Sequence, residues 1–402
     1  MMRKMDLRTF SALWKSLRLT VLLLCLWPVP GMAQSTAAGD VNSSSSSAAP
    51  ASLNGDFKSA IVIDAETGLV LVANNDRQRR QPASMLKMMT ELIVLDHLVD
   101  GDLKMDEIVK VSANASRMGG SQVYLKHGEE FTVEELLHAL AIHSANDAAT
   151  ALAEHVAGST IAFVDLMNMK GMDLGLLDTE FHSVHGLPAG RGQKPDLSTA
   201  RDMAILGREL IKHPQALEWA SIKTAPFRDG KFTLYNPNKL VGTYRGLDGI
   251  KTGYTGSAGF CVTASAVQKG KRLISVVMGC PSDRSRATET TRLLTYGFNA
   301  YRQVAIIPEA GVALPDPVLL KGGKKKQAIV GFGESLTVSV PRNREGDLVV
   351  HNRLPDSIQA PLVAHQEVGR AVVILDGLEL GSVPLVVLED YPKGNWFDRL
   401  MN

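Results

Sequence analysis

The stretch QPASMLKMMT, residues 81–90, places a lysine among long apolar side chains, three residues after a serine. Residues three apart lie on one face of a helix, so Ser84 and Lys87 can meet. A lysine removed from water loses its proton more easily, and a neutral amine beside a hydroxyl activates that hydroxyl as a nucleophile. Pro82, just before the apolar run, is typical of a helix N-terminus. The pattern indicates a serine nucleophile with a lysine base; a solvated helical lysine is the alternative.

The N-terminal residues 1–33 have the pattern of a secretory signal peptide. Basic residues precede the apolar run LTVLLLCLW (19–27), and small residues follow in PGMA. That order is the pattern of an export signal with its cleavage site. The next segment, 34–55, is rich in Ser and Ala and is predicted to be a linker. We therefore expect an exported protein.

The folded part holds about 350 residues, enough for two domains with sizeable cores. The chain has 43 Lys and Arg against 42 Asp and Glu, so we expect no nucleic-acid partner. Cys261 and Cys280 flank a predicted hairpin, which leaves a disulfide and two separate buried thiols both open. The histidines show no metal-ligand spacing, and we expect no metal and no cofactor.

Hairpin patterns stand at both ends of a helical segment. Alternating apolar residues predict hairpins in 59–75 and 259–279. Helical periodicity recurs in five stretches, 84–99, 132–158, 160–171, 198–212 and 286–301. The order predicts an α+β domain over 56–304, in which strands from both ends form an antiparallel sheet around a helical insertion. Short β-rich runs between Gly, Pro and Asp turns predict a small all-β domain over 305–391.

The last segment, 392–402, is predicted to be a short amphipathic tail. Trp396, Phe397, Leu400 and Met401 share one face of a helix about two turns long. So short a helix supplies at most a weak contact, and no basic run adjoins it in the sequence to add attraction to anionic lipid. We expect a periplasmic protein with weak, reversible peripheral contact to the inner membrane. The basic run KGGKKK (321–326) is predicted to be a solvated loop, with contact to an anionic surface as the alternative.

Two further motifs accompany Ser84 and Lys87, HSAND (143–147) and DGIKTGYT (248–255). In this order Ser-x-x-Lys, Ser-x-Asn and Lys-Thr-Gly match the signature of penicillin-recognising serine enzymes. The match extends through three longer segments, SRMGGSQVYLKHGEEFTVEELLHALAIHSANDAATALAE, LDGIKTGYTGSAGF and TRLLTYGF. From about residue 56 onward the chain resembles the exported D-alanyl-D-alanine carboxypeptidases, which are low-molecular-mass penicillin-binding proteins.

This resemblance implies a β-lactamase/transpeptidase-like fold followed by the all-β domain. It also implies removal of the terminal D-Ala from peptidoglycan stem pentapeptides through an acyl-serine, with β-lactams as covalent inhibitors. Ser84 is expected to be the nucleophile, Lys87 the base and Ser144 a proton relay to the leaving amine. Substrate binding is expected from a second set, Asn146, Lys251, Thr252, Gly253, Tyr254 and Arg286.

Within this second set the Asn146 amide holds the substrate backbone, and Lys251 and Thr252 face its carboxylate. Gly253 lets an extended peptide approach the strand edge. By the resemblance, backbone N–H groups of Ser84 and Tyr254 form the oxyanion hole. Arg286 helps to bind the carboxylate by the same resemblance, with a plain surface arginine as the alternative.

The sequence also departs from its relatives and leaves alternatives. Many family members have histidine where this chain has Tyr254, so any imidazole contribution to deacylation is absent here. His185 in VHGLP either shuttles protons or, as we favour, braces its loop by hydrogen bonds. A class A β-lactamase would need a Glu-x-x-Leu-Asn loop, which does not occur between Asn146 and Lys251. A non-catalytic peptidoglycan-binding scaffold is disfavoured because all three motifs are intact.

Overall fold

The structure is a computed structural model that describes residues 50–396. The expected signal peptide, the linker up to residue 49 and the tail from residue 397 lie outside the described residues. Within residues 50–396 we find no helix with the length and apolar character needed to cross a membrane.

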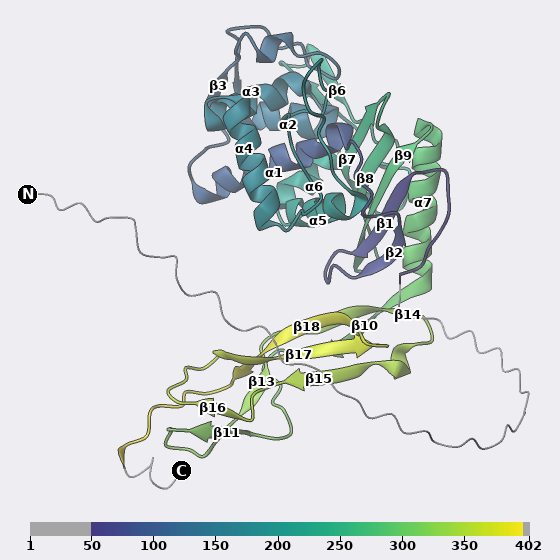
Figure 1. The fold of residues 1–402 in the computed structure, drawn as a ribbon. Helices are drawn as coiled ribbons and strands as arrows, with labels where there is room; N and C mark the ends of the chain where they lie inside the picture. The colour runs from purple at the N-terminus through teal and green to yellow at the C-terminus, as the bar shows by residue number, and fades with distance from the viewer. Residues whose placement is uncertain (1–49, 397–402) are drawn as a thin grey trace, which may run out of the picture. The chain divides into compact units, whose positions relative to one another are not determined.

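A five-stranded antiparallel sheet forms the centre of the N-terminal part, in the order β2-β1-β9-β8-β7 (Figure 1). Its strands are β1 (Ser59–Asp64), β2 (Val70–Asn74), β7 (Leu247–Thr255), β8 (Gly259–Gln268) and β9 (Lys271–Cys280). The two expected hairpins are present as β1–β2 and β8–β9. Strands from both ends of the segment share one sheet, which confirms the predicted architecture.

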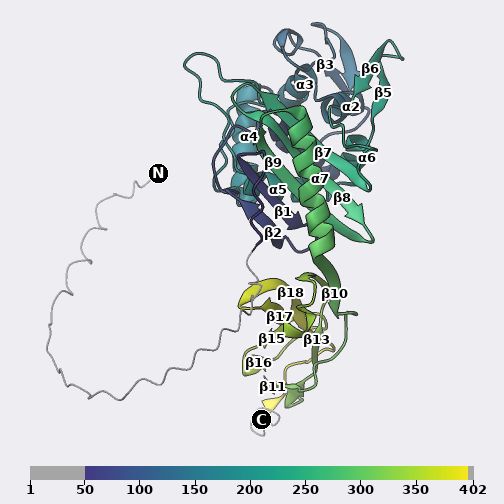
Figure 2. The same ribbon diagram turned by 90° about the vertical axis from the view of Figure 1, so that its right-hand side faces the viewer.

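Both faces of the sheet are covered, and this explains why β8 and β9 are buried at most of their positions. Along β9, Ile274 and Val276 pack with the helical insertion, whereas Leu273 and Val277 pack with α7 (Asp283–Ala300). Successive side chains of a strand point to opposite faces, so a strand covered on both sides buries all of them. Figure 2 shows α7 lying across one face of the sheet.

The helical insertion contains six α-helices between β2 and β7. They are α1 (Lys87–Asp100), α2 (Val133–His143), α3 (Asn146–Ala157), α4 (Thr160–Asp173), α5 (Ala200–Leu210) and α6 (Pro214–Ala220). Two small hairpins accompany them, β3 (Ile108–Lys110) with β4 (Glu130–Thr132) and β5 (Thr224–Phe227) with β6 (Phe232–Tyr235). The sequence patterns did not predict these hairpins.

The helical run expected over 132–158 is broken in the middle. Thr132 begins α2 with a capping box to Glu135, and the helix ends where Ser144 takes a left-handed conformation with φ 65°. Ala145 is extended, and α3 starts at Asn146. Because a left-handed residue cannot continue a helix, one apolar periodicity spans two helices. The break presents Ser144 and Asn146 side by side.

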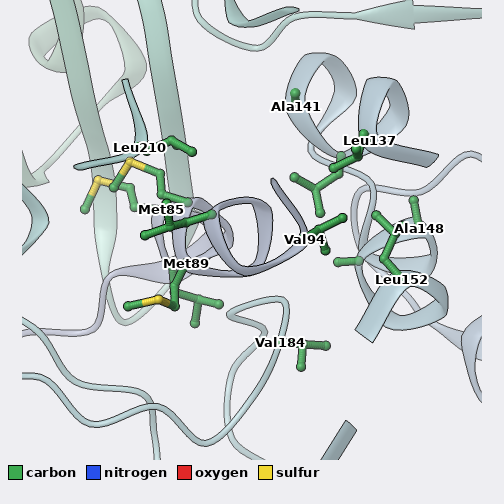
Figure 3. Close-up of a cluster of buried hydrophobic side chains, with 14 of the residues drawn as sticks. Met85, Met89, Val94, Leu137, Ala141, Ala148, Leu152, Val184 and Leu210 are labelled. Carbon is green, nitrogen blue, oxygen red and sulfur yellow. The ribbon is translucent and has the colours of Figure 1, made fainter. Parts of the chain in front are cut away.

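The main core surrounds α1, nine of whose residues are buried. Figure 3 shows Met85 and Met89 near the start of this helix, and Val94, farther along it, near Ala148 and Leu152. The methionines of the 85–89 turn are core residues, because Met85, Met88 and Met89 are fully buried.

The two cysteines are separate buried thiols. Of the two alternatives left open by the sequence, the structure therefore has the unbridged one. Burial raises the pKa of Cys280 to about 12, so this thiol stays protonated at neutral pH.

The C-terminal part is built from strands around a core of its own. Strand β10 (Tyr301–Ile307) follows α7 directly and pairs with β14 (Leu336–Pro341), so it extends across the expected boundary at 304/305. The other strands form two further sheets: β11 (Val318–Lys321) with β12 (Gln327–Ala328) and β16 (Ser357–Gln359), and β13 (Val330–Phe332), β18 (Leu378–Val387), β17 (Glu367–Leu375) and β15 (Val349–Arg353). The all-β character predicted for this region is confirmed.

Candidate active site

Ser84 lies in a tight turn that leads into α1. A short 3-10 helix covers Ala83–Leu86, and α1 continues from Lys87. The residue before the serine, Ala83, has a positive φ of 49°, a conformation that costs energy for a residue with a side chain. This turn separates Ser84 from Lys87 by three residues, and the Lys87 Nζ and Ser84 Oγ atoms are 2.9 Å apart.

Lys87 is fully buried and meets three oxygens. Its Nζ lies 2.5 Å from Asn146 Oδ1, 2.9 Å from the His185 carbonyl oxygen and 2.9 Å from Ser84 Oγ. Burial holds the pKa of Lys87 well below its usual range, the charge of Lys251 lowers it further, and Asp147 opposes the shift. The site therefore favours the neutral amine.

A neutral Lys87 has two N–H groups and one lone pair. The Asn146 and His185 oxygens can only accept hydrogen bonds, whereas the Ser84 hydroxyl can also donate. The Asn146 orientation is supported by its Nδ2, which donates to the Gly119 carbonyl at 2.6 Å. Donating both N–H groups to these two acceptors leaves the lone pair of a neutral Lys87 for the Ser84 O–H. This is the arrangement that a general base requires.

The junction of α2 and α3 brings Ser144 and Asn146 to the same site. Asn146 donates its backbone N–H to Ser121 O at 2.7 Å, and the Asp147 carboxylate accepts from the backbone N–H groups of Val123 and Leu125. The junction is therefore tied to the loop before β4. Ser144 is 4% exposed, and none of the residues 50–396 forms a hydrogen bond with its hydroxyl.

Strand β7 carries Lys251 and Thr252 into the site, where both are buried. Burial lowers the pKa of Lys251 to about 7; the Glu91 carboxylate opposes this shift and the charge of Arg286 adds to it. Within the described chain, the Lys251 Nζ has a single long hydrogen bond, to Thr252 O at 3.4 Å. A buried cation with so few partners has donors available for an incoming anion.

Gly253 lies directly against the nucleophile turn. A Cβ added there would lie 2.7 Å from the Pro82 carbonyl oxygen and 3.1 Å from the Ser84 nitrogen. Glycine at this position therefore makes room for the turn that packs on β7. That it also lets an incoming peptide approach the strand edge stays a prediction.

Tyr254 and Arg286 both lie close to the Phe260 ring. The Tyr254 ring is 56% exposed and stacks on Phe260 with centroids 4.1 Å apart, and the Arg286 guanidinium lies 5.8 Å from the Phe260 ring centre. Arg286 is only 7% exposed, so the surface-arginine alternative is wrong. It donates to the Cys261 carbonyl at 3.3 Å and forms an ion pair with Asp283.

The His185 loop contributes a part of the site that sequence reasoning missed. Its carbonyl oxygen accepts from Lys87, while the ring Nδ1 accepts from the Leu187 backbone N–H at 3.1 Å. Burial lowers the pKa of His185 to about 4, and the nearby Lys87 charge lowers it further, so the ring is neutral. These contacts match the loop-bracing interpretation. At Gly186, with φ 79°, a Cβ would lie 2.2 Å from the Ala83 carbonyl oxygen.

Glu91 is a second residue that the motifs did not indicate. It lies one helical turn beyond Lys87, is 2% exposed, and its Oε1 has no hydrogen-bond partner among the described residues. Burial raises the pKa of Glu91 to about 8, and the charge of Lys251 opposes the shift. Its position on the buried face of α1, four residues after Lys87, was the available signal. Residues 50–396 contain no cluster of His, Cys, Asp or Glu side chains that could hold a metal ion.

Comparison with known proteins agrees with this geometry. A family model described as D-alanyl-D-alanine carboxypeptidase matches residues 44–282, and one described as penicillin-binding protein 5, C-terminal domain, matches residues 314–393. The D-alanyl-D-alanine carboxypeptidase DacF of Bacillus subtilis is 36% identical over 349 residues, which cover 86% of this chain and 88% of that protein.

Solved structures with the same architecture are also similar. Penicillin-binding protein 5 from Haemophilus influenzae has a TM-score of 0.75 and 32% identity, covering 85% of this chain and 99% of that one. Penicillin-binding protein D2 from Listeria monocytogenes, in an ampicillin-bound form, has a TM-score of 0.57 and 32% identity, covering 61% of this chain and 99% of that one. By sequence and by structure, this chain belongs to the D-alanyl-D-alanine carboxypeptidase family.

Proposed function

We propose that this protein is a serine D-alanyl-D-alanine carboxypeptidase that removes the terminal D-Ala from peptidoglycan stem pentapeptides through an acyl-serine intermediate. The observation that carries the proposal is the surrounding of Lys87. The fully buried Lys87 amine lies 2.5 Å from Asn146 Oδ1 and 2.9 Å from the His185 carbonyl oxygen, which can only accept, and 2.9 Å from Ser84 Oγ, whose hydroxyl can donate to a neutral amine. That environment serves proton transfer, whereas a scaffold protein would have no need to bury an amine.

The proposed reaction has two halves. Lys87 takes the hydroxyl proton as Ser84 Oγ attacks the carbonyl carbon of the penultimate D-Ala. The C–N bond then breaks, the leaving amine of the terminal D-Ala receives a proton, and an acyl ester remains on Ser84. Water then cleaves the ester and restores the serine hydroxyl. We assign the proton delivery to Ser144, which lies next to Asn146 at the α2–α3 junction and has a hydroxyl free to turn toward the leaving group.

For the oxyanion we assign the backbone N–H groups of Ser84 and Tyr254. This assignment is supported by the close packing at Gly253, whose Cα lies against the backbone around Ser84. With no side chain between strand and turn, N–H groups from both segments are available to the same oxygen. Such preorganised donors stabilise the charge that develops in the transition state.

For the substrate carboxylate we assign Lys251 and Thr252, with Arg286 in support. Lys251 is buried with one long hydrogen bond, so an arriving carboxylate would supply its missing partner. Arg286 is already paired with Asp283, and we therefore assign it a long-range electrostatic contribution that strengthens if the carboxylate displaces that pair. The second N–H of the Asn146 side-chain amide, beyond the one bound to Gly119, is the group assigned to the substrate backbone.

We further propose that β-lactams acylate Ser84. The ampicillin-bound neighbour supports this, because its chain shares the fold of the N-terminal part. The segment between Asn146 and Lys251 lacks the Glu-x-x-Leu-Asn loop that a class A β-lactamase uses to activate water. The acyl-enzyme formed with penicillin should therefore persist, and the protein should act as a target rather than as a β-lactamase.

We place the protein in the periplasm, in weak and reversible contact with the inner membrane. Support comes from the signal-peptide pattern of residues 1–33 and from the apolar residues of the tail, of which Trp396 is 65% exposed. Phe397, Leu400 and Met401 lie outside the described residues.

The test is to incubate the purified protein with a D-Ala-D-Ala-terminated peptide and, separately, with a fluorescent penicillin. We expect stoichiometric release of D-Ala from the peptide and a long-lived fluorescent label on Ser84. Rapid turnover of the penicillin without D-Ala release would identify a β-lactamase instead. Absence of both reactions in folded protein would leave only a binding role.

A further inference from the structure

We propose that one end of the C-terminal β domain is a docking surface for an anionic lipid bilayer. This surface, called the basic end, consists of Lys321, Lys324, Lys325, Lys326 and Lys393. The inference rests on the proposed export of the protein but not on its proposed chemistry. It assigns the membrane contact to a folded surface, in addition to the tail.

Two segments about seventy residues apart in sequence build the basic end. Gly323, within KGGKKK, forms an isolated antiparallel bridge with Lys393, and the Gly394 N–H donates to the Gly322 carbonyl at 2.8 Å. The last described residues therefore lie beside the loop that follows β11 (Figures 1 and 2). The expectation that no basic run adjoins the tail holds for the sequence alone and is wrong for the folded chain.

The lysines of the basic end are mostly without counter-charges. All five are exposed, and Lys325 pairs with Glu389 at 2.5 Å. None of the other four has a carboxylate within ion-pair distance in the part of the chain that the structure describes. Unpaired cations clustered on one surface create a local positive potential, although the whole chain is nearly neutral. This potential favours a negatively charged partner.

Exposed apolar side chains lie at the same end of the domain. Ile329 is 47% exposed and donates its N–H to the Tyr391 hydroxyl at 2.6 Å, and Val363 is 67% exposed and follows Leu362, which bridges to Tyr391. Trp396 is 65% exposed. A folded surface that combines lysines with an indole and branched aliphatic chains matches a bilayer interface, where lysines meet anionic headgroups and apolar groups enter between them. A purely polyanionic polymer would recognise the lysines alone.

The electrostatic contribution of the lysines to membrane affinity is large compared with the contribution expected from the short tail. A lysine held near an anionic leaflet strengthens binding about fivefold, and the effect falls off within a Debye length. Several unpaired lysines therefore add a salt-sensitive attraction to the marginal affinity expected of the tail. The orientation follows as well, because the basic end would face the bilayer.

The experiment measures binding of the protein, without its expected signal peptide, to vesicles of phosphatidylcholine with and without phosphatidylglycerol. The test variant is the double charge reversal Lys324→Glu with Lys326→Glu. The matched control is Lys104→Glu with Lys231→Glu, which reverses two exposed lysines of the N-terminal part. D-Ala release from a soluble peptide is measured in parallel, so that loss of catalysis and loss of docking are distinguished.

We expect the wild type and the control to bind the anionic vesicles at low salt and to dissociate at high salt. The test variant should bind at least about tenfold more weakly, with unchanged D-Ala release. Brominated lipid should quench Trp396 in a Trp219→Phe background. Equal binding of test variant and wild type, or equal binding to neutral vesicles, would overturn the proposal, and so would binding to a soluble polyanion without binding to vesicles.

Discussion

The N-terminal part and the C-terminal β domain differ most in what they bury. Among the described residues, buried polar and charged side chains are numerous before residue 300 and include Lys87, Asn146 and Lys251. Beyond residue 300 only Ser339 belongs to this class. Burying a polar group costs free energy unless it is partnered, and burying an amine costs more. In the N-terminal part, this cost falls on residues of the candidate active site. The described part of the β domain buries mainly apolar side chains, which stabilise its fold.

The difference also separates two kinds of sensitivity to mutation. Substitutions among the buried polar residues of the active site, such as Lys87, Asn146 and Lys251, should change the reaction rates by orders of magnitude. They should cost little stability, because these residues are arranged for activity rather than for folding. Substitutions in the β domain should change stability or membrane contact and leave the rates intact. The predictions below test this separation, beginning with the largest effect.

Ser84→Ala should abolish both D-Ala release and penicillin labelling. Loss of a serine nucleophile lowers kcat by on the order of 10⁴-fold or more, because its base has nothing left to activate. The measurements are D-Ala release and mass spectrometry of the penicillin adduct. The matched control is Ser339→Ala, the single buried polar residue of the β domain, which should lower Tm and leave both reactions intact. A penicillin adduct mapped to another residue would exclude Ser84 as the nucleophile.

Lys87→Arg should reduce acylation by about the same factor as removal of a general base, on the order of 10²–10⁴-fold. Arginine stays protonated where the Lys87 amine is neutral, and its fork of donors leaves no lone pair for the Ser84 hydroxyl. The rate of labelling by fluorescent penicillin reports the effect, with circular dichroism as the control for folding. Near-normal acylation by a folded variant would show that Lys87 is a structural cation.

Much of the site was predictable because its chemistry is encoded in short local patterns. Ser84 and Lys87 share one helical turn, and Lys-Thr-Gly entering a strand is visible as a sequence. The break at Ser144 was not predictable, because the apolar period continues through it and only a left-handed backbone interrupts the helix. The contact of Gly186 with Ala83 was not predictable either, since it joins segments about a hundred residues apart.

The fold shows the same division between local and distant information. Both large hairpins and the all-β region follow from residue alternation and turn residues, which act over a few positions. The small hairpins β3–β4 and β5–β6 are too short for alternation to be recognised. The pairing of Gly323 with Lys393 depends on tertiary structure, so the sequence does not show that the basic run and this segment are neighbours.

The titration of Lys251 should limit activity on the alkaline side. The protonated amine is the form that binds a carboxylate, and with a pKa of about 7 it is present below this pH and lost above it. We therefore expect kcat/KM for a peptide with a free C-terminal carboxylate to fall as pH rises through this range.

An ester substrate without a C-terminal carboxylate serves as the control for this profile. It should lack the alkaline fall, since it makes no use of the Lys251 charge. Identical profiles for the two substrates would assign the alkaline fall to a different group.

Gly186→Ala should slow acylation by a smaller factor, about ten- to a hundredfold, by moving the nucleophile turn. The new Cβ would lie 2.2 Å from the Ala83 carbonyl oxygen, so the turn before Ser84 must shift. Gly192→Ala is the matched control, because Gly192 has a similar φ of 82° and nothing within 4 Å of its Cβ position. Both variants should lose comparable stability from the positive φ, measured as Tm. Equal acylation rates in the two variants would show that the Gly186 contact does not position Ser84.

The smallest effect is expected from removing the β domain altogether. A chain that ends at Arg302 retains α7, which covers the catalytic sheet, and Tyr301, whose hydroxyl donates to the Leu71 carbonyl at 3.1 Å. All residues assigned to the active site precede Arg302. The three hydrogen-bond partners of Lys87, which are Ser84, Asn146 and His185, also precede it. Acylation by fluorescent penicillin should therefore proceed at the wild-type rate within about twofold, since sites that share no partners behave additively.

The truncated chain should be less soluble, because residues that packed on the β domain become exposed, and it should no longer bind anionic vesicles. Loss of acylation in a truncated chain that is folded by circular dichroism would show that the β domain takes part in forming the catalytic site, and the division between the two regions would then be wrong.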